Sequence, residues 1–173
     1  GLELLESYEG REDLSLFGTI NRTLTGMGRR LLKFRITHPF LREEDILRVQ
    51  EGVEELTKNR ELLREIRTCL EKMPDLERLA SRISGNLATP RDFSLLRKAL
   101  LSLKELREVL KDARSSIMVE LLNQMVDLEG LYLELERVLV EDPPIHLKEG
   151  GLIKDGVDPQ LDELRSIKAK GEM

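Results

Sequence analysis

The sequence predicts an all-α protein, a multi-helix bundle, on three observations. First, its 173 residues are rich in leucine, with 40% hydrophobic, 35% charged and 3% aromatic residues, a composition typical of packed amphipathic helices. Second, apolar residues recur every three or four positions over most of the chain. Third, residues that favour helix starts precede several of these segments. No apolar run approaches roughly 18 residues, which excludes a membrane span.

Apolar stripes with a spacing of three and four residues define the expected helices. They predict helices over 43–57, 60–73 and 89–112, and a further periodic stretch over 117–138. The residues on these stripes are, in chain order, Ile46, Val49, Val53 and Leu56; Leu63, Ile66, Leu70 and Met73; Phe93, Leu96, Leu100, Leu103 and Leu110; and Ile117, Leu121, Met125, Leu128, Leu131, Leu135 and Val138. Because each stripe covers one helix face, we expect these faces to meet in a stiff core.

Local signals mark the ends of several helices. Thr89-Pro90-Arg91-Asp92 offers a threonine N-cap, a proline at the first helical position and an acid at the third. Ser15 and Thr25 are the expected N-caps of two short helices near the N-terminus. We expect the second of these to end at His38-Pro39, because a residue before proline avoids the α region.

The segment after the bundle differs from the rest. Pro143-Pro144 stops the preceding helix, and Ile145–Leu147 and Leu152–Lys154 flank the turn at Gly150-Gly151, which predicts a small two-stranded ribbon. Asp158-Pro159 then repeats the arrangement of a cap followed by proline. The expected organisation is a helical core over 1–142, a short extended hinge over 143–157 and the start of a long helix over 158–173.

No residue pattern predicts a catalytic, cofactor-binding or metal-binding site. Gly26-Met27-Gly28 lacks the further glycine and the lysine of a phosphate loop, so we interpret it as a closely packed helix turn. His38 and His146 have no Glu three residues before them and no partner Cys or His. Cys69, the lone cysteine, lies on an apolar stripe, which predicts a buried, unreactive thiol and fits a reducing compartment. Most carboxylates lie opposite the stripes and are expected to be solvated, among them Glu61, Glu65 and Glu71.

A basic segment over 22–42 is the candidate ligand surface. The net charge of −5 is mild, yet residues 14–42 contain no Asp or Glu. The basic side chains there are Arg22, Arg29, Arg30, Lys33, Arg35 and Arg42. They are suited either to phosphate contacts with nucleic acid or to ion pairs with acids of neighbouring helices or of a partner domain. Only Phe34 and Phe40 interleave, which argues against base stacking.

Several motifs follow one another in order along the chain. The first is Asn21-Arg22-Thr23-x-Thr25-x-Met27-Gly28-x-Arg30-Leu31-Leu32, followed by Pro39, Ile46 and Val53. Asp75-Leu76-Glu77-Arg78, Arg82 and Pro90-Arg91-Asp92 come next. The last and most specific is Gly150-Gly151-x-Ile153-x-Asp155-Gly156-x-Asp158-x-x-Leu161-Asp162-Glu163-Leu164-Arg165, in which glycine turns meet a capped helix start. In this order the motifs resemble the middle domain of the MutS family of DNA mismatch repair proteins.

The resemblance implies a role that composition does not indicate. MutS proteins are dimers that clamp around DNA, recognise mispairs with an N-terminal domain and hydrolyse ATP in a C-terminal domain. Their middle domain is a helical core whose long levers connect the ATPase to the clamp. No mispair-reading Phe-x-Glu motif occurs, since neither Phe17, Phe34, Phe40 nor Phe93 has Glu two positions later. ATP and Mg²⁺ therefore belong to an ATPase domain absent from this chain, and no catalytic, cofactor-binding or metal-binding residue is expected here.

The expected partners also follow from the resemblance. They are the other domains of a longer parent protein, mismatched duplex DNA, a MutL-like repair partner and a second copy in a homodimer, all in the cytoplasm and away from membranes. The start at Gly1 without a signal segment adds the expectation of a piece cut from that parent.

Two functions from different classes are open on the sequence alone. The first is a core and lever domain that couples ATPase and clamp and has no activity of its own. In this function Pro143-Pro144 and Gly150-Gly151 either set the angle of the lever or are ordinary turns. The second is a self-standing helical module that binds nucleic acid or docks a partner through segment 22–42. The first function predicts that the helix over 159–173 packs poorly on the bundle.

Overall fold

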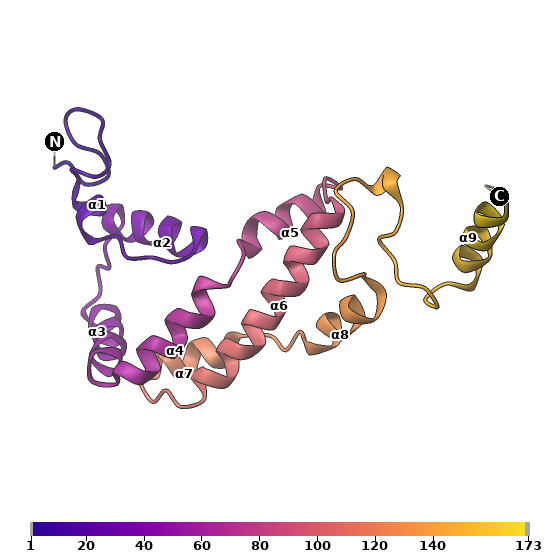
Figure 1. Ribbon diagram of the computed structural model, residues 1–173. Coiled ribbons are helices and arrows are strands. Elements are labelled where there is room, and N and C mark those ends of the chain that lie inside the picture. The colour runs from indigo at the N-terminus through magenta and orange to yellow at the C-terminus, as the bar shows by residue number, and fades with distance from the viewer. Residues whose placement is uncertain (1, 172–173) are drawn as a thin grey trace.

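The computed structural model describes residues 2–171, which form helices joined by turns and loops. The helices are α1 (Leu16–Ile20), α2 (Gly26–Thr37), α3 (Glu43–Lys58), α4 (Arg60–Glu71), α5 (Leu76–Ser84), α6 (Pro90–Leu110), α7 (Ser116–Gln124), α8 (Glu129–Val138) and α9 (Pro159–Gly171), with one 3₁₀ turn at Leu147–Glu149. They form an elongated, open arrangement, with α1 and α2 at one end and α9 at the other (Figure 1). The all-α prediction is confirmed.

The core lies where α4 runs antiparallel beside α6 (Figure 1). Its fully buried members are Leu62, Ile66, Leu110 and Ala113. The predicted stripes of α4 and α6 do meet, but the buried face of α4 is centred on Leu62 and not on Leu63. Partly buried apolar side chains of α3, α6 and α7 extend this cluster: Leu56, Leu106, Val109, Met118 and Leu122.

The predicted stripe of α3 is only partly covered. Val49 and Leu56 are half-buried, but Ile46 is 40% exposed and Val53 is 59% exposed, whereas Gly52 is buried. A Cβ atom on Gly52 would lie 2.6 Å from Cγ2 of Ile117, so the missing side chain is what allows α3 and α7 to approach each other. Close approach of the two backbones therefore overrides the apolar periodicity here.

Cap signals predict the helix ends well. Thr89 and Asp92 form the expected capping box at the start of α6. The Ser15 and Thr25 hydroxyls accept hydrogen bonds from the third residues of α1 and α2. Asp158 accepts from the first backbone amides of α9 at 2.8 and 3.1 Å. These bonds join residues only two or three positions apart, which is why sequence reveals them.

One helix is missing from the prediction. α5 begins after Asp75, whose carboxylate accepts from the Arg78 amide at 3.2 Å, and it buries Leu79. The signal was present, because Leu76, Leu79 and Ile83 have helical spacing behind a Pro74-Asp75 start. The periodic stretch over 117–138 is also two helices, α7 and α8, and not a single one.

The expected ribbon has a different partner. Residues 147–149 form the 3₁₀ turn, and Ile153 makes an antiparallel bridge to Leu139 instead of pairing with 145–147. The bonds are Val140 N–H to Leu152 C=O, 3.1 Å, and Lys154 N–H to Val138 C=O, 2.8 Å. The glycine turn thus returns the chain to the end of α8, where unpaired backbone groups are available.

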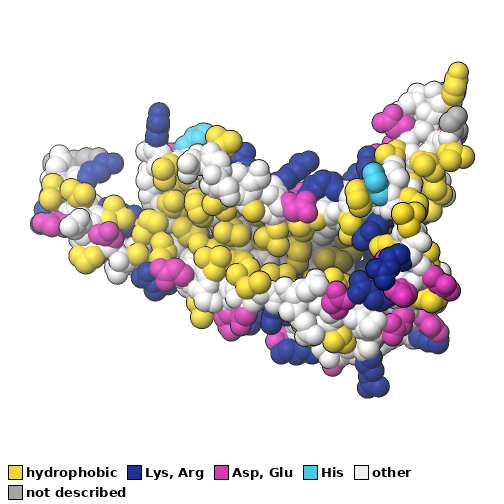
Figure 2. Space-filling model, turned by 180° about the vertical axis from the view of Figure 1, so that it is seen from behind, with side chains coloured by type: hydrophobic (Ala, Val, Ile, Leu, Met, Phe, Trp, Pro, Cys, Tyr) yellow, Lys and Arg dark blue, Asp and Glu magenta, His cyan; other side chains and the backbone are white. Residues whose placement is uncertain are grey.

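α9 stands apart from the bundle and buries none of its residues (Figure 1). This agrees with the predicted poor packing of residues 159–171, and residues 172–173 lie outside the described part. The whole chain is open: its accessible surface is 12588 Å², while a compact protein of 19.9 kDa has about 8,700 Å². Apolar side chains form a broad band across the back of the molecule (Figure 2). Within residues 2–171, no helix combines the length and apolarity needed to cross a bilayer.

Candidate functional site: the basic segment and the joints between helices

Arg30, in the basic segment, is fully engaged with acids at the start of α5. Its guanidinium donates two hydrogen bonds to the Asp75 carboxylate, at 2.7 and 2.8 Å, and also contacts Glu77 at 2.5 Å. Arg30 therefore holds the pKa of Asp75 below its usual range. A Cβ atom on Gly26 would lie 2.6 Å from an Asp75 oxygen, so Gly26-Met27-Gly28 is a closely packed turn, as predicted.

Arg29 and Lys33 converge on one carboxylate. Lys33 Nζ lies 2.7 Å from Glu12 Oε2, and Arg29 pairs with the other oxygen. The Lys33 and Arg29 hydrogen bonds lower the pKa of Glu12 against a smaller opposing effect of burial. Both cations also lie over the buried Phe17 ring, within 5.0 Å of its centroid. These contacts tie the N-terminal loop to α1 and α2.

The remaining basic side chains of the segment also have partners inside the chain. Arg22 donates to backbone carbonyls, the nearer at 2.9 Å. Arg35 lies 4.1 Å from the centroid of the Phe40 ring. Arg42 contacts Glu44 at 2.5 Å. Within the chain, Arg29, Arg30, Lys33 and Arg42 thus pair with carboxylates, while Arg22 and Arg35 do not.

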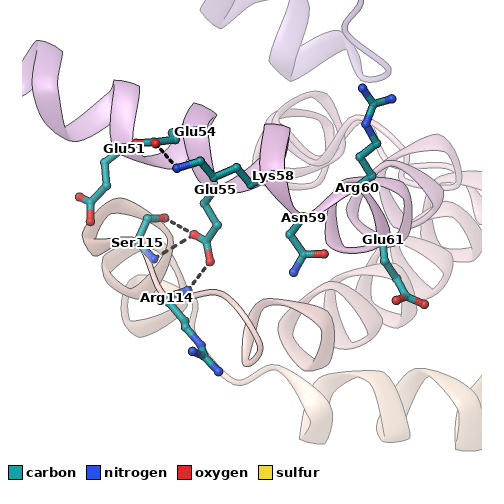
Figure 3. A pocket seen from close by; sticks show the side chains of 9 residues that line it. All are labelled: Glu51, Glu54, Glu55, Lys58, Asn59, Arg60, Glu61, Arg114 and Ser115. Atoms are coloured by element: carbon teal, nitrogen blue, oxygen red, sulfur yellow. Dashed lines mark hydrogen bonds and ion pairs between the residues drawn. The ribbon is translucent and has the colours of Figure 1, made fainter.

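A second set of charged residues forms the joint between α3 and α7. The Glu55 carboxylate accepts hydrogen bonds from the backbone amides of Arg114 at 2.6 Å and Ser115 at 2.9 Å, and from the Ser115 hydroxyl (Figure 3). Burial alone would raise the pKa of Glu55, but these hydrogen bonds outweigh it and lower the pKa. Ser116 adds a 2.6 Å bond to Glu51. Glu55 thus holds the turn that leads into α7, whose own N-cap, Ser115, makes no side-chain cap bond.

A shallow hollow of about 810 Å³ lies beside this joint, and Figure 3 shows the side chains along it. Glu55 points at the α7 start and Glu54 pairs with Lys58, while Asn59 and Arg60 lie at the other end (Figure 3). These carboxylates are bound in the joint, and residues 2–171 contain no group of three side chains that could hold a metal ion. The hollow is a consequence of how the two helices meet.

The nucleophile and imidazole candidates lie apart in the fold. Cys69 is 5% exposed, and burial raises the pKa of its thiol, which disfavours the thiolate. His38 stacks on Phe34 with ring centroids 4.4 Å apart at the end of α2. His146 lies at the 3₁₀ turn, where its backbone amide donates to Glu149. The structure brings neither histidine into a hydrogen bond with the thiol.

Arg97 of α6 binds the backbone of the segment that follows α8, a role the sequence did not suggest. Its guanidinium donates to the carbonyls of Leu139, Val140 and Glu141 at 3.4, 3.2 and 3.0 Å. The side chain is only 12% exposed. An arginine within an apolar helix carries no local mark of such a partner, so only the fold identifies it.

Arg165 repeats this arrangement at the other strand of the bridge. It donates to the Ile153 carbonyl at 2.9 Å and pairs with Asp155 at 2.6 Å. We use the name exit joint for residues 138–141 and 152–155 together with Arg97 and Arg165. The exit joint links α6, α8 and the base of α9 through consecutive hydrogen bonds.

The fold and these contacts define an all-helical domain in which several charged residues join one helix to another. Residues 1–170 match the family model described as MutS domain III. The chain is 52% identical to the DNA mismatch repair protein MutS of Aquifex pyrophilus, over 99% of the chain and 20% of that protein. It is 46% identical to MutS of Persephonella marina, over 98% of the chain and 19% of that protein. It is 39% identical to a MutS of Thermus thermophilus, over 98% of the chain and 20% of that protein. The chain belongs to the MutS domain III family, and it spans about a fifth of the length of these relatives.

Proposed function

We propose that this chain is the core and lever domain of a MutS-like DNA mismatch repair protein and couples an ATPase domain to the DNA clamp and mismatch-binding domains. Family membership supports the placement in mismatch repair. In this proposal the chain has no activity alone, since ATP and Mg²⁺ bind elsewhere in the longer protein. That protein acts as a cytoplasmic homodimer on mismatched duplex DNA, together with a MutL-like partner.

The exit joint is the observation that carries the proposal. A lever transmits motion only if its base is fixed to the body that moves, since packed interiors displace as units. Here Arg97 binds the 139–141 backbone, Leu139 pairs with Ile153, and Arg165 of α9 binds the Ile153 carbonyl. A displacement of α6 is therefore passed to α9 through hydrogen bonds, although α9 has no packed face of its own.

The uncovered surface supports the same role. The accessible surface area exceeds that of a compact protein of this mass, and the excess falls in the range that large obligate interfaces bury. The back of the central helices is apolar over a wide area (Figure 2). A domain that packs against several others in a longer protein has this kind of surface. The alternative of a self-standing binder through segment 22–42 is less well supported, because its main cations already pair with Glu12, Asp75 and Glu77.

The test uses the full-length protein that contains this chain. Arg165→Ala removes the bond from α9 to the exit joint without touching any other helix. We expect the ATP hydrolysis rate without DNA and the affinity for mismatched duplex without nucleotide to stay near wild type. The change in hydrolysis rate on adding mismatched duplex should shrink, because motion at one end no longer reaches the other.

Arg137→Ala is the matched control, since Arg137 is an exposed arginine paired only within α8, with Glu134 at 2.6 Å. It should leave all three measurements unchanged. Equal behaviour of the Arg165 and Arg137 variants would refute the coupling role of the exit joint.

A further inference from the structure

The outer face of α4 carries a groove of about 470 Å³ that no role described so far uses. Three arginines line it at helical spacing, Arg60, Arg64 and Arg67, and Glu71 is the acid at its far end. Thr57 and Thr68 also line it, but both hydroxyls donate to backbone carbonyls of their own helices. The guanidinium groups are therefore the hydrogen-bond donors that a ligand in this groove would meet.

These arginines differ from Arg29 and Arg30 of segment 22–42 in lacking close acidic partners. Arg60 has no hydrogen bond or ion pair with any of residues 2–171. Arg64 has one 3.8 Å contact with Glu61, and both side chains are about three-quarters exposed, so the pair is weak. Arg67 donates to the Arg22 carbonyl at 3.2 Å, which leaves its charge uncompensated.

Their placement is unfavourable for the helix itself. Arg60 and Arg64 are four residues apart, where like charges repel on a helix surface. A recess lined by like charges also concentrates the electric field and attracts counter-ions. The chain thus keeps three cations together in one hollow, although it neutralises Arg29, Arg30 and Lys33 with carboxylates elsewhere.

We propose that this groove binds the phosphate backbone of duplex DNA without reading base sequence; the choice of DNA rests on the function proposed above. The planar guanidinium fork suits phosphate oxygens. Arg60 to Arg67 spans about 10 Å of helix axis, which is the rise of about three base pairs along the axis of a duplex. The groove has no aromatic lining residue, so base stacking has no platform.

The experiment measures how salt weakens DNA binding in the full-length protein. A fluorescein-labelled, perfectly paired duplex is titrated by anisotropy at several salt concentrations. Each phosphate contact contributes about 0.9 to the slope of log K against log salt. The double variant Arg60→Ala with Arg64→Ala should therefore reduce the slope by about 2. The charge-keeping variant Arg60→Lys with Arg64→Lys should retain most of it.

The matched control is Arg91→Ala with Lys98→Ala on α6. Both side chains are exposed, and neither makes a hydrogen bond or ion pair with any of residues 2–171, so the same charge is removed outside the α4 groove. This variant should keep the wild-type slope.

The proposal fails if the Arg60 and Arg64 alanine variant and the Arg91 and Lys98 alanine variant lower the slope equally, which would show that the DNA responds to the overall charge of the protein. It also fails if neither variant lowers the slope. It also fails if the Arg60 and Arg64 variant loses binding of poly-glutamate while its duplex slope stays at the wild-type value, which would assign the groove to an acidic protein. Each result is independent of the Arg165 experiment, because the exit joint contains no residue of the groove.

Discussion

The carboxylate of Glu55 on α3 holds the turn before α7 by accepting hydrogen bonds from both the backbone amide and the hydroxyl of Ser115. These two residues are 60 positions apart, so one helix fixes the start of another. The first prediction is that Glu55→Ala lowers the free energy of unfolding by about 1–3 kcal/mol, because the donors of this turn lose their acceptor. Urea unfolding followed by circular dichroism measures it.

Glu54→Ala is the control for this change, since Glu54 pairs only with exposed Lys58 on its own helix. Its effect should stay within about 0.5 kcal/mol. Equal losses in the two variants would show that the Glu55 hydrogen bonds to the turn before α7 contribute little to stability.

The second prediction concerns acid. The pKa of Asp75 is lowered, chiefly by Arg30, so the ionised carboxylate stabilises the folded state. This contribution is complete above the unfolded-state pKa of about 3.9 and is lost as the pH falls through the lower folded-state pKa. Asp75→Asn should therefore be less stable than wild type at pH 6, and the gap should narrow as the pH falls below about 3.9. A gap that does not change with pH would mean that the asparagine perturbs packing and that the ion pair contributes little.

The third prediction reverses the usual effect of replacing a helical glycine. Alanine normally gains about 1 kcal/mol over glycine inside a helix. Gly52→Ala should instead destabilise by about 1–3 kcal/mol, because its Cβ would lie 2.6 Å from Ile117 and force α3 and α7 apart. Gly130→Ala in α8 meets nothing within 4 Å and should be neutral or stabilising. Thermal unfolding of both variants measures these changes in stability. A stabilising Gly52→Ala would contradict the observed contact.

The fourth prediction concerns the relative stability of the helices. α9 buries none of its residues, whereas α6 buries Ala99, Leu100 and Leu110. Backbone amides of α9 should therefore exchange with solvent much faster than those of central α6. Hydrogen–deuterium exchange with mass spectrometry checks this on the 173-residue chain. Equally slow exchange in the two helices would count against α9 as a lever held only at its base.

The stripes and caps predicted most helices, because their information is local. Thr89 and Asp92 bond across three residues, and so do Asn59 and the Leu62 amide. The predictions that failed depend on partners distant in sequence. The packing of α3 depends on the approach of Ile117 to Gly52. The pairing of the ribbon depends on Leu139, which no pattern in 143–157 indicates.

The candidate site divides in the same way. The basic segment 22–42 and the motifs typical of the family were evident from sequence, as was the absence of a phosphate loop. Which carboxylates engage Arg30 and Lys33, and which arginines stay without an acid, was not evident, because pairs such as Arg30 and Asp75 are 45 residues apart.

By itself, then, the sequence determined the helical class, most helix starts and the resemblance to MutS domain III, since periodicity, capping and short motifs need only neighbouring residues. The tertiary structure alone decided that Glu55 of α3 holds the turn before α7, that Arg97 and Arg165 join the exit segment, and that α4 keeps an unneutralised groove. These features depend on where a charged side chain or a backbone carbonyl lies in space, and that depends on how all the helices pack.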